Sequence, residues 1–160
     1  MIISIIAAIA SNRVIGAGNK IPWDLPVDRS WFKIMTLHKT VLMGRHTWES
    51  IAVPLKDRCN IVISRTNLDI VGARSVSTIE KALSLSELEE ELMVIGGGSI
   101  YQQMLPKAER LYLTHIDTKV EGDIYFPDYN IRKWQVIFSK VVYADENNPY
   151  NLLFEILIRR

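Results

Sequence analysis

Four short runs of almost continuously apolar residues constrain the fold of this chain most strongly. They are IISIIAAIA, TVLMG, NIVIS and LMVIG, at residues 2–10, 40–44, 60–64 and 92–96. Runs of this length that are rich in β-branched residues indicate strands buried on both faces, as in a parallel sheet. A further run, RLYLTHID at 110–117, alternates between apolar and polar residues, so we expect it to have one exposed face.

Helical patterns separate these runs. They cover residues 26–36, 45–51, 77–85 and 99–105. The first begins at Pro26, a residue favoured at the first helical position, and the third has Ser77 or Thr78 as its N-cap. Two long strand-like runs, 134–144 and 151–159, flank the loop DENNPY and predict an antiparallel pair. This order predicts an α/β fold with helices on both faces of a mixed sheet, mainly parallel, with an antiparallel strand at its end.

The composition excludes several classes of function. With 160 residues the chain suits a single domain, residues 1–160, with one substantial core. A formal net charge of +1 provides no general field for nucleic acid or an anionic membrane. The lone cysteine, Cys59, excludes an internal disulfide and fits a reducing compartment. Because MIISIIAAIA lacks a basic n-region and a small-residue cleavage site, we interpret it as a buried strand and expect a cytoplasmic protein.

Two glycine turns share one design. VLMGRHTWES and MVIGGGSIYQQM each lead from an apolar strand through glycine directly into a helix. Unpaired N–H groups at a helix start favour an anion, and glycine allows close approach, so the two turns together predict a dinucleotide site. The Rossmann fingerprint matches poorly, because Tyr101 stands where GxGxxG requires its last glycine. Either turn alone is equally well read as a tight strand–helix connection.

Basic residues near these turns indicate which dinucleotide binds. Arg45 and His46 follow the first glycine, and Ser64 and Arg65 stand at the end of NIVIS. A strand end that binds the ribose of NAD usually carries an acid, whereas an arginine and a serine suit a ribose phosphate. The residues therefore predict NADPH. The alternative is that these arginines are solvated surface residues.

An aspartate stands among apolar residues in the stretch IPWDLPVDRSWFK, residues 21–33. Trp31 and Phe32 follow Asp28 by three and four positions, at the mouth of the first predicted helix, and Trp23 precedes it. Burial there raises the pKa of a carboxyl group and requires paired donors. The alternative is that Asp28 is an N-terminal capping acid, which is favourable at a helix start.

The chain resembles the dihydrofolate reductases of bacterial chromosomes in six motifs that occur in the family's order and spacing. They are IAAIASNRVIG, IPWDLPVDRSWFK, VLMGRHTWESI, MVIGGGSIY, YLTHID and EGDIYFPDY. The resemblance runs from Ile2 to Arg159. It implies a single-domain fold with a central eight-stranded mixed sheet flanked by four helices. It also implies NADPH-dependent reduction of dihydrofolate to tetrahydrofolate, which supplies one-carbon metabolism.

The resemblance implies the residues of a substrate site. Asp28 would be the one ionisable side chain in the pterin pocket, with Thr114 sharing its hydrogen bond and Trp23 holding a water nearby. The backbone carbonyl of Ile6 would meet the pterin amino group, and Arg58 would pair bidentately with the glutamate tail. The other implied substrate contacts are Ala7, Ala8, Phe32, Ile51, Leu55 and Ile95. The implied catalytic residues are Asp28, Trp23 and Tyr101.

The resemblance also places the two glycine turns around NADPH. The implied cofactor contacts are Ala8, Ile15, Gly16, Gly44, Arg45, His46, Thr47, Ser64, Arg65, Ile95, Gly97, Gly98, Ser99, Ile100 and Tyr101. A non-proline cis peptide would join Gly96 to Gly97, as in the family. We expect no metal site, because the three histidines lack metal-ligand spacing, and we interpret His38 and His115 as structural.

A loop from Ser11 to Leu25 would close over the nicotinamide by the same resemblance, with Gly16 and Gly18 as pivots and Asp123 bonded to its backbone. Four residues depart from the family pattern, namely Ile21, Arg29, Ser99 and Pro149. Arg29 stands at a usually apolar position, and we expect it to point outward. Ser99 removes one cationic contact to the cofactor, for which Arg65 would compensate. Ile21 replaces the usual Met or Leu of this loop, and Pro149 stands where a hydrogen-bonding residue often helps to hold it. Both residues would affect the equilibrium between the open and closed forms of the loop.

Two other readings compete with this one. The first is another NADPH reductase of the same fold, of the riboflavin-pathway type, which should lack the Asp28 pocket and Arg58. The second is a non-catalytic nucleotide-binding module, which has no reason to bury Asp28. The resemblance further implies a monomer that binds dihydrofolate and antifolates of the diaminopyrimidine and pteridine type, with neither nucleic acid nor a membrane as partner.

Overall fold

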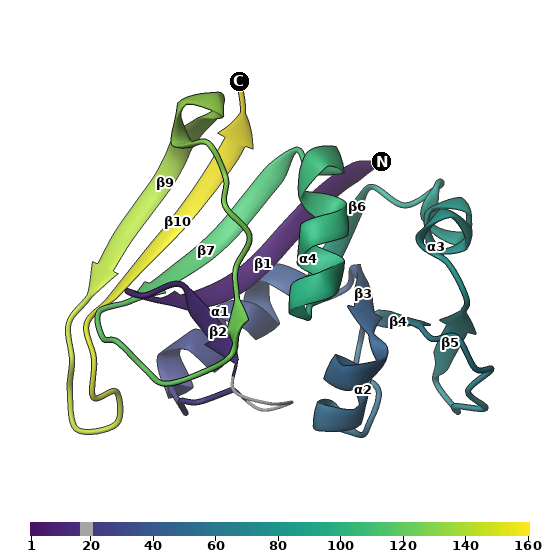
Figure 1. Cartoon of the computed structure of the whole chain (residues 1–160), viewed down its shortest axis with the longest axis horizontal. Helices are drawn as coiled ribbons and strands as arrows, with labels where there is room; N and C mark the ends of the chain where they lie inside the picture. Colours follow the sequence, from purple (N-terminus) through teal and green to yellow (C-terminus); the bar gives the residue numbers. More distant parts are fainter. Residues whose placement is uncertain (17–20) are drawn as a thin grey trace.

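The computed structural model describes residues 1–16 and 21–160. Its centre is a twisted eight-stranded sheet that spans the molecule (Figure 1). From one edge to the other, the strands are β5 (Ala73–Val76), β4 (Cys59–Ile63), β3 (Thr40–Gly44), β6 (Glu91–Gly96), β1 (Ile2–Ala10), β7 (Arg110–Ile116), β10 (Leu152–Arg159) and β9 (Trp134–Val142).

The sheet is mixed, and its middle is parallel. β1 pairs in parallel with β6 and β7, β3 pairs in parallel with β4 and β6, and β5 extends this arrangement beside β4. β10 is antiparallel to both of its neighbours, β7 and β9. The predicted α/β class, the parallel centre and the antiparallel C-terminal pair are therefore confirmed.

Helices cover both faces of the sheet. They are α1 (Pro26–Thr36), α2 (Arg45–Ile51), α3 (Ile79–Ser86) and α4 (Gly98–Met104). α1 and α2 contribute to a core with Ile6 and Val41, whereas α3 and α4 contribute to a core with Ile5 and Leu42. Successive residues of a strand point to opposite faces, so the two cores lie on opposite sides of the sheet. The four predicted helices are confirmed within two residues, and Thr78 is the N-cap of α3.

The expectation of an exposed face on β7 is wrong. Leu111 to Thr114 are all buried, although apolar and polar residues alternate along the strand. The polar members have partners inside the protein. The hydroxyl of Tyr112 donates to Glu91 at 2.8 Å, and that of Thr114 donates to Asp28 at 2.7 Å. The alternation therefore reflects buried hydrogen bonds and not contact with solvent.

The sequence patterns assigned no range to β5, the eighth strand of the implied sheet, and four shorter elements were not predicted. β2 (Val14–Gly16) pairs with β8 (Ile124–Tyr125) in a separate two-stranded sheet, and the short helices η1 (Leu105–Lys107) and η2 (Ile131–Lys133) precede β7 and β9. Elements of two or three residues are too short to show a period of apolar residues. In the part of the chain that the structure describes, no helix is long and apolar enough to cross a bilayer.

Candidate active site

The predicted site residues lie together at one end of the sheet, where the central parallel strands have their carboxyl ends. There the register places Ala8 beside Thr114 and Met43 beside Gly96. Both glycine turns begin at this end of the sheet, because β3 ends at Gly44 and β6 ends at Gly96. A crevice at the carboxyl ends of parallel strands is where α/β proteins commonly bind ligands.

Asp28 lies in the first turn of α1 and reaches the sheet. It is partly buried, and its Oδ1 accepts the hydrogen bond from Thr114. Burial raises the pKa of Asp28 above its ordinary value, and the hydrogen bond from Thr114 offsets part of that rise. Thr114 uses one oxygen of the carboxylate, so the other oxygen can accept a donor from a ligand. A planar ring with two adjacent N–H donors suits this carboxylate.

An apolar wall adjoins Asp28. Ile6, on β1, shares one core cluster with the predicted substrate contacts Phe32, Ile51, Leu55 and Ile95. A neighbouring cluster on the same face holds Ala8 and Trp23. The structure places the side chain of Ala7 apart from these, on the opposite face, in the core that contains Tyr101. The predicted contact of Ala7 with the substrate would therefore involve its backbone and not its side chain.

Tyr101 joins the ends of two central strands. Its hydroxyl lies 2.7 Å from the carbonyl oxygen of Ile6 and 2.9 Å from that of Ile95, and it donates to one of them at a time. Burial, followed by the charge of Asp28, raises the pKa of Tyr101. The phenol is therefore neutral at physiological pH. It holds β1 and β6 in place beside the Asp28 pocket.

The glycine turn after β6 depends on glycine. The bond between Gly96 and Gly97 is cis, as expected, and Gly96 has a φ of 121°, which side chains rarely adopt. A Cβ atom on Gly98 would lie 2.8 Å from Cγ2 of Ile124. A Cβ atom on Gly44 would lie 3.0 Å from Cγ1 of Ile100, so the two glycine turns pack closely against each other. α2 and α4 both start here without a side-chain N-cap, which leaves backbone donors for an anion.

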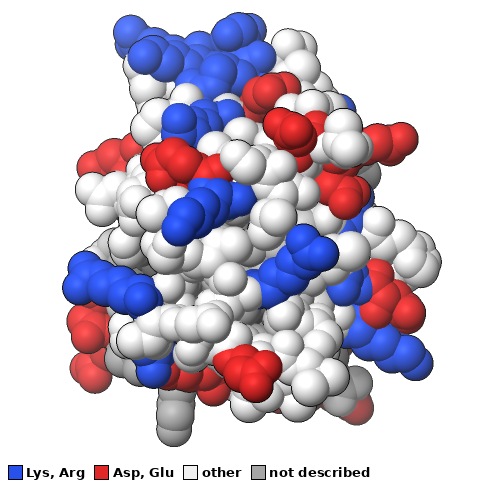
Figure 2. All heavy atoms as spheres, turned by 90° about the vertical axis from the view of Figure 1, so that its right-hand side faces the viewer, with Lys and Arg blue, Asp and Glu red and all other residues white. Residues whose placement is uncertain are grey.

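A cluster of donors surrounds the end of β4. Nη1 of Arg45 donates to Oγ1 of Thr66 at 2.9 Å, and the hydroxyl of Ser64 lies 3.3 Å from that same oxygen. Nε of Arg45 also binds Glu49 at 2.9 Å. Figure 2 shows the face at the right-hand side of Figure 1, where basic and acidic side chains are interspersed over most of the surface. The positive charge beside the turns is therefore local. Arg65 and His46 are both exposed there.

Arg58 is held near the C-terminal end of α1. Its Nη1 donates to Oγ1 of Thr36 at 3.1 Å, and its Nε donates to the carbonyl oxygen of Lys56 at 2.9 Å. The loop before it is organised by Asn60, whose side chain bonds both the N–H and the carbonyl oxygen of Leu55. This arrangement fixes a guanidinium at the open end of the apolar wall, where it suits a carboxylate.

Sequence reasoning missed the polar residues that support the predicted ones. Thr66 and Glu49 hold Arg45, Thr36 holds Arg58, and Asn60 shapes the loop beside Leu55. Thr66 has a faint signal, because it follows Ser64 by two residues at the same strand end. The other supporting residues show none, since each contact depends on how the elements fold together.

The structure places three of the residues that depart from the family pattern on the surface. Arg29 points outward, as expected, and forms an exposed ion pair with Asp24. Ser99 is exposed and accepts a hydrogen bond from the side chain of Gln103 at 3.1 Å. Ile21 is 64% exposed. Of the loop from residue 11 to 25, residues 17–20 lie outside the described residues, so the predicted pivot Gly18 is not placed and the role of Asp123 remains a prediction. No group of three or more metal-ligating side chains occurs among the residues that are described.

Comparison with known proteins identifies the family. The family model described as dihydrofolate reductase matches residues 2–159. A dihydrofolate reductase of Buchnera aphidicola is 53% identical over 99% of this chain and 100% of its own length. A dihydrofolate reductase of Haemophilus influenzae is 44% identical over the whole of both chains.

Solved structures agree with the sequence comparison. The structure of dihydrofolate reductase from Enterococcus faecalis complexed with NADP(H) and RAB-propyl superposes with a TM-score of 0.92 at 31% identity, covering 99% of this chain and 96% of that one. The eight-stranded sheet, the carboxylate on α1 and the two glycine turns fit the same assignment. The chain belongs to the dihydrofolate reductase family, whose members reduce dihydrofolate to tetrahydrofolate with NADPH.

Proposed function

We propose that this enzyme reduces dihydrofolate in the cleft between α1 and the two glycine turns, with Asp28 as the residue that binds and polarises the pterin ring. The observation that carries this proposal is the contact between Asp28 and Thr114 in an apolar surrounding that raises the pKa of the carboxyl group. A carboxylate placed there stabilises a ring that gains a proton. No polar group of this kind is needed to hold a nucleotide alone.

Asp28 acts on the ring nitrogen at a distance. Its carboxylate accepts hydrogen bonds from the amino group and adjacent N–H of the pterin, which orients the ring. The buried negative charge raises the basicity of the imine nitrogen, and water beside Trp23 supplies the proton. NADPH, when bound, supplies the hydride that reduces the imine carbon. Tyr101 and the apolar wall align the pocket and exclude bulk water.

The outer parts of the cleft hold the ends of the two molecules. Arg58, fixed by Thr36, binds the carboxylate of the glutamate tail. The donors of the glycine turns, together with Ser99 and Thr47, bind the pyrophosphate. Arg45, Ser64 and Arg65 bind the ribose phosphate, which makes NADPH the preferred cofactor. Diaminopyrimidine and pteridine antifolates would occupy the same pocket through Asp28, because their protonated rings present the same pair of donors.

We also infer that the chain is one domain that works as a monomer in the cytoplasm, with the loop at residues 11–25 closing over the nicotinamide. All eight strands of the main sheet come from one continuous chain segment, Ile2 to Arg159. The exposed free thiol of Cys59 fits a reducing compartment.

The direct test is the decrease in absorbance of NADPH when dihydrofolate is added. Rapid oxidation of NADPH that requires dihydrofolate supports the proposal. A reductase of the riboflavin-pathway type would oxidise NADPH only with its own aminopyrimidine substrate. A non-catalytic module would bind NADPH and leave the absorbance constant with either compound. Both of the latter results contradict the proposal.

A further inference from the structure

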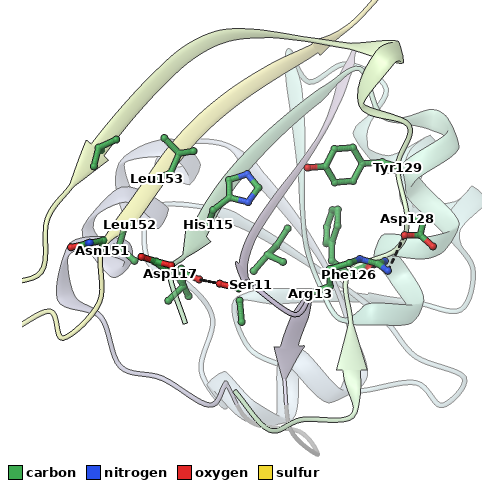
Figure 3. Close-up of a pocket in the computed structure, with 14 residues that line it drawn as sticks. Ser11, Arg13, His115, Asp117, Phe126, Asp128, Tyr129, Asn151, Leu152 and Leu153 are labelled. Atoms are coloured by element: carbon green, nitrogen blue, oxygen red, sulfur yellow. Dashed lines mark hydrogen bonds and ion pairs between the residues drawn. The ribbon is translucent and has the colours of Figure 1, made fainter. Parts of the chain in front are cut away.

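A hollow of about 570 Å³ lies between the sheet strands β7, β9 and β10 and the segment that carries Phe126 and Tyr129 (Figure 3). His115 on β7 and Leu153 on β10 are register partners and line this hollow. The next residues along these strands, Thr114 and Phe154, point to the other face, where Thr114 meets Asp28. The sheet therefore separates this hollow from the pterin pocket.

The hollow has an apolar body and an aromatic wall. Leu153 forms part of its floor, and Val141 on β9 stands at its rim with half of its surface exposed. Tyr129 and Phe126 form the opposite wall and pack edge to face with their ring centroids 5.9 Å apart. In Figure 3 the phenol oxygen of Tyr129 points toward the imidazole of His115. An exposed valine beside a concave wall is the type of surface that a ligand covers.

Carboxylates outnumber cations around this hollow. Asp128 is neutralised by Arg13 at 2.8 Å. Oε1 of Glu155 lies 2.6 Å from Nε2 of His115, which balances its charge only when the imidazole is protonated. Asp117 lines the hollow and forms no ion pair within the described residues. Burial, followed by the charge of Glu155, raises the pKa of Tyr129, and Arg13 offsets this in part. Asp117, at the exposed edge of the hollow, is therefore the lining carboxylate that no described cation pairs with.

We propose that this hollow is a second ligand site, which takes a small organic cation consisting of a protonated amine on an apolar or aromatic body. The ammonium group would bind the carboxylate of Asp117. The side-chain oxygen of Asn151 already accepts from the N–H of Ala144 at 2.8 Å and has a second lone pair for the ammonium group. The body would cover Leu153 and Val141 and lie against the ring of Tyr129. A cation beside an aromatic face gains additional attraction.

Binding there reaches the first residues of the proposed active-site loop, which runs from residue 11 to 25. Ser11 borders the hollow, and its N–H and hydroxyl bind the carbonyl oxygens of Thr118 and Ile116 at 2.8 and 3.3 Å. Arg13 also borders it, and its carbonyl oxygen accepts from the N–H of Phe126 at 2.9 Å. Directly beyond them, β2 pairs with β8.

β8 in turn contacts the glycine turn at the active site. Ile124 on β8 packs so closely on Gly98 that a Cβ atom there would lie at 2.8 Å. A ligand that displaces Arg13 or Phe126 therefore moves elements that touch the proposed cofactor site. We expect occupancy of the hollow to change the rate of hydride transfer, and this second part of the proposal rests on the proposed function.

The first test is a titration of the ¹⁵N-labelled enzyme with 2-phenylethylamine, followed by NMR. NADPH and a pteridine antifolate are present at saturation, so that Asp28 is covered. We expect saturable shifts of the amides of Ser11, His115, Asp117 and Leu153. The neutral analogue 2-phenylethanol and the anion phenylacetate should bind about fivefold more weakly, which is near the upper end of the range for an exposed ion pair. Equal binding of all three compounds, or shifts that map elsewhere, would overturn the site.

Three variants sharpen the result. Asp117→Asn should weaken the amine about fivefold and leave the alcohol unchanged, whereas Asp69→Asn, an exposed carboxylate after β4, should alter neither. Val141→Trp should block both ligands by filling the rim. An unchanged amine affinity in Asp117→Asn contradicts the assignment of the ammonium group.

Single-turnover hydride transfer with and without the amine then tests the coupling. We expect a change of at least about twofold in the parent and none in Val141→Trp. Binding without any change in rate would refute the coupling alone, because the NMR titration detects the site whether or not the enzyme turns over.

Discussion

Arg58 is the residue whose role is easiest to isolate. Its guanidinium is fixed by Thr36 and the carbonyl oxygen of Lys56, at the end of the apolar wall. A charged hydrogen bond at a partly desolvated site contributes about 1.5–3 kcal/mol, so Arg58→Leu should weaken dihydrofolate binding at least tenfold. A pterin without the glutamate tail should bind almost as before. Equilibrium titration of both ligands checks this, with Lys56→Leu as the control. If both ligands weaken alike, Arg58 is structural.

Arg45 tests the cofactor assignment at the same scale. Its contacts with Thr66 and Glu49 hold the guanidinium beside Ser64. Arg45→Leu should raise the KM for NADPH more than the KM for NADH, because only NADPH carries the additional phosphate. Steady-state kinetics with both cofactors measure the ratio, and Arg74→Leu on β5 provides the control. Equal changes for the two cofactors would exclude Arg45 from phosphate binding.

The role of a single residue could be predicted where its side chain differs in chemistry from its sequence neighbours. An aspartate among tryptophans and a glycine at the end of an apolar strand both stand out in one sequence. Thr36 and Thr66 do not, because a threonine shows its function only through the partner that the fold brings to it. The resemblance to the family implied the contact of Thr114 with Asp28, across 86 positions of sequence, which local pattern alone does not reveal.

Helix α1, which carries Asp28, is capped by a distant loop. Its N-cap residue, Leu25, provides no side-chain bond, but Oδ1 of Asn148 accepts from the N–H of Val27 at 3.0 Å. Asn148 is 6% exposed, and Asp145 accepts from its backbone N–H at 2.8 Å. The loop between β9 and β10 therefore stabilises the start of the helix that carries the carboxylate.

Removing this cap should destabilise the protein. Asn148→Ala should lower the free energy of unfolding by about 1 kcal/mol, the usual value of an N-cap. Asn147→Ala, in the same loop but exposed, should lower it by less than half as much. Urea unfolding of the three proteins gives the comparison. Equal stability of Asn148→Ala and the parent would show that water replaces the cap without loss.

The elements themselves were largely predictable, and the exceptions have physical causes. Long apolar runs and helices with clear starts were recovered almost residue for residue. β7 was misjudged because its polar residues bond to Glu91 and Asp28 inside the protein. β2 and β8 were missed because two or three residues carry no period. Their pairing depends on Gly122, where a Cβ atom would lie 2.5 Å from the carbonyl oxygen of Gly16.

A polar network joins the adjacent strands β6, β1 and β7 at the end of the sheet opposite the active site. Glu91 on β6 accepts from Ser4 on β1 at 2.6 Å and from Tyr112 on β7 at 2.8 Å, and it pairs with Lys39 at 2.7 Å. Burial by itself would raise the pKa of Glu91, but the bonds from Lys39, Ser4 and Tyr112 lower it below its ordinary value. The ionised form is therefore favoured in the folded state.

This network makes stability depend on pH. A carboxyl group with a lowered pKa stabilises the protein above its unfolded pKa, near 4.5, and that contribution disappears as the pH falls through the folded value. Glu91→Gln should cost about 1.5–3 kcal/mol at pH 7. The difference from the parent should shrink below about pH 4.5. Denaturant unfolding across this range measures it. A difference that stays constant with pH would assign the loss to packing.

At the scale of the whole molecule, the sheet order and the second hollow were beyond local pattern. Strand order follows from which apolar faces meet, and the sequence indicates only that buried strands exist. The hollow beside His115 arises because β9, β10 and the segment before η2 leave a gap that none of the described residues fills. The function was predictable because the family keeps several long motifs in one order.

The buried charge of Asp28 should promote protonation of the substrate. Asp28→Asn keeps the shape of the side chain and removes that charge. The most direct measurement is single-turnover hydride transfer in the parent and this variant, from mildly acidic to basic pH, with NADPH binding as a control. We expect the variant to be slower by about 10²–10⁴ at neutral pH. Acid should recover much of the loss, because bulk protons then reach the ring nitrogen without help, and NADPH should bind both proteins equally. A variant that matches the parent at neutral pH would contradict this role and reduce Asp28 to a charge at a helix start.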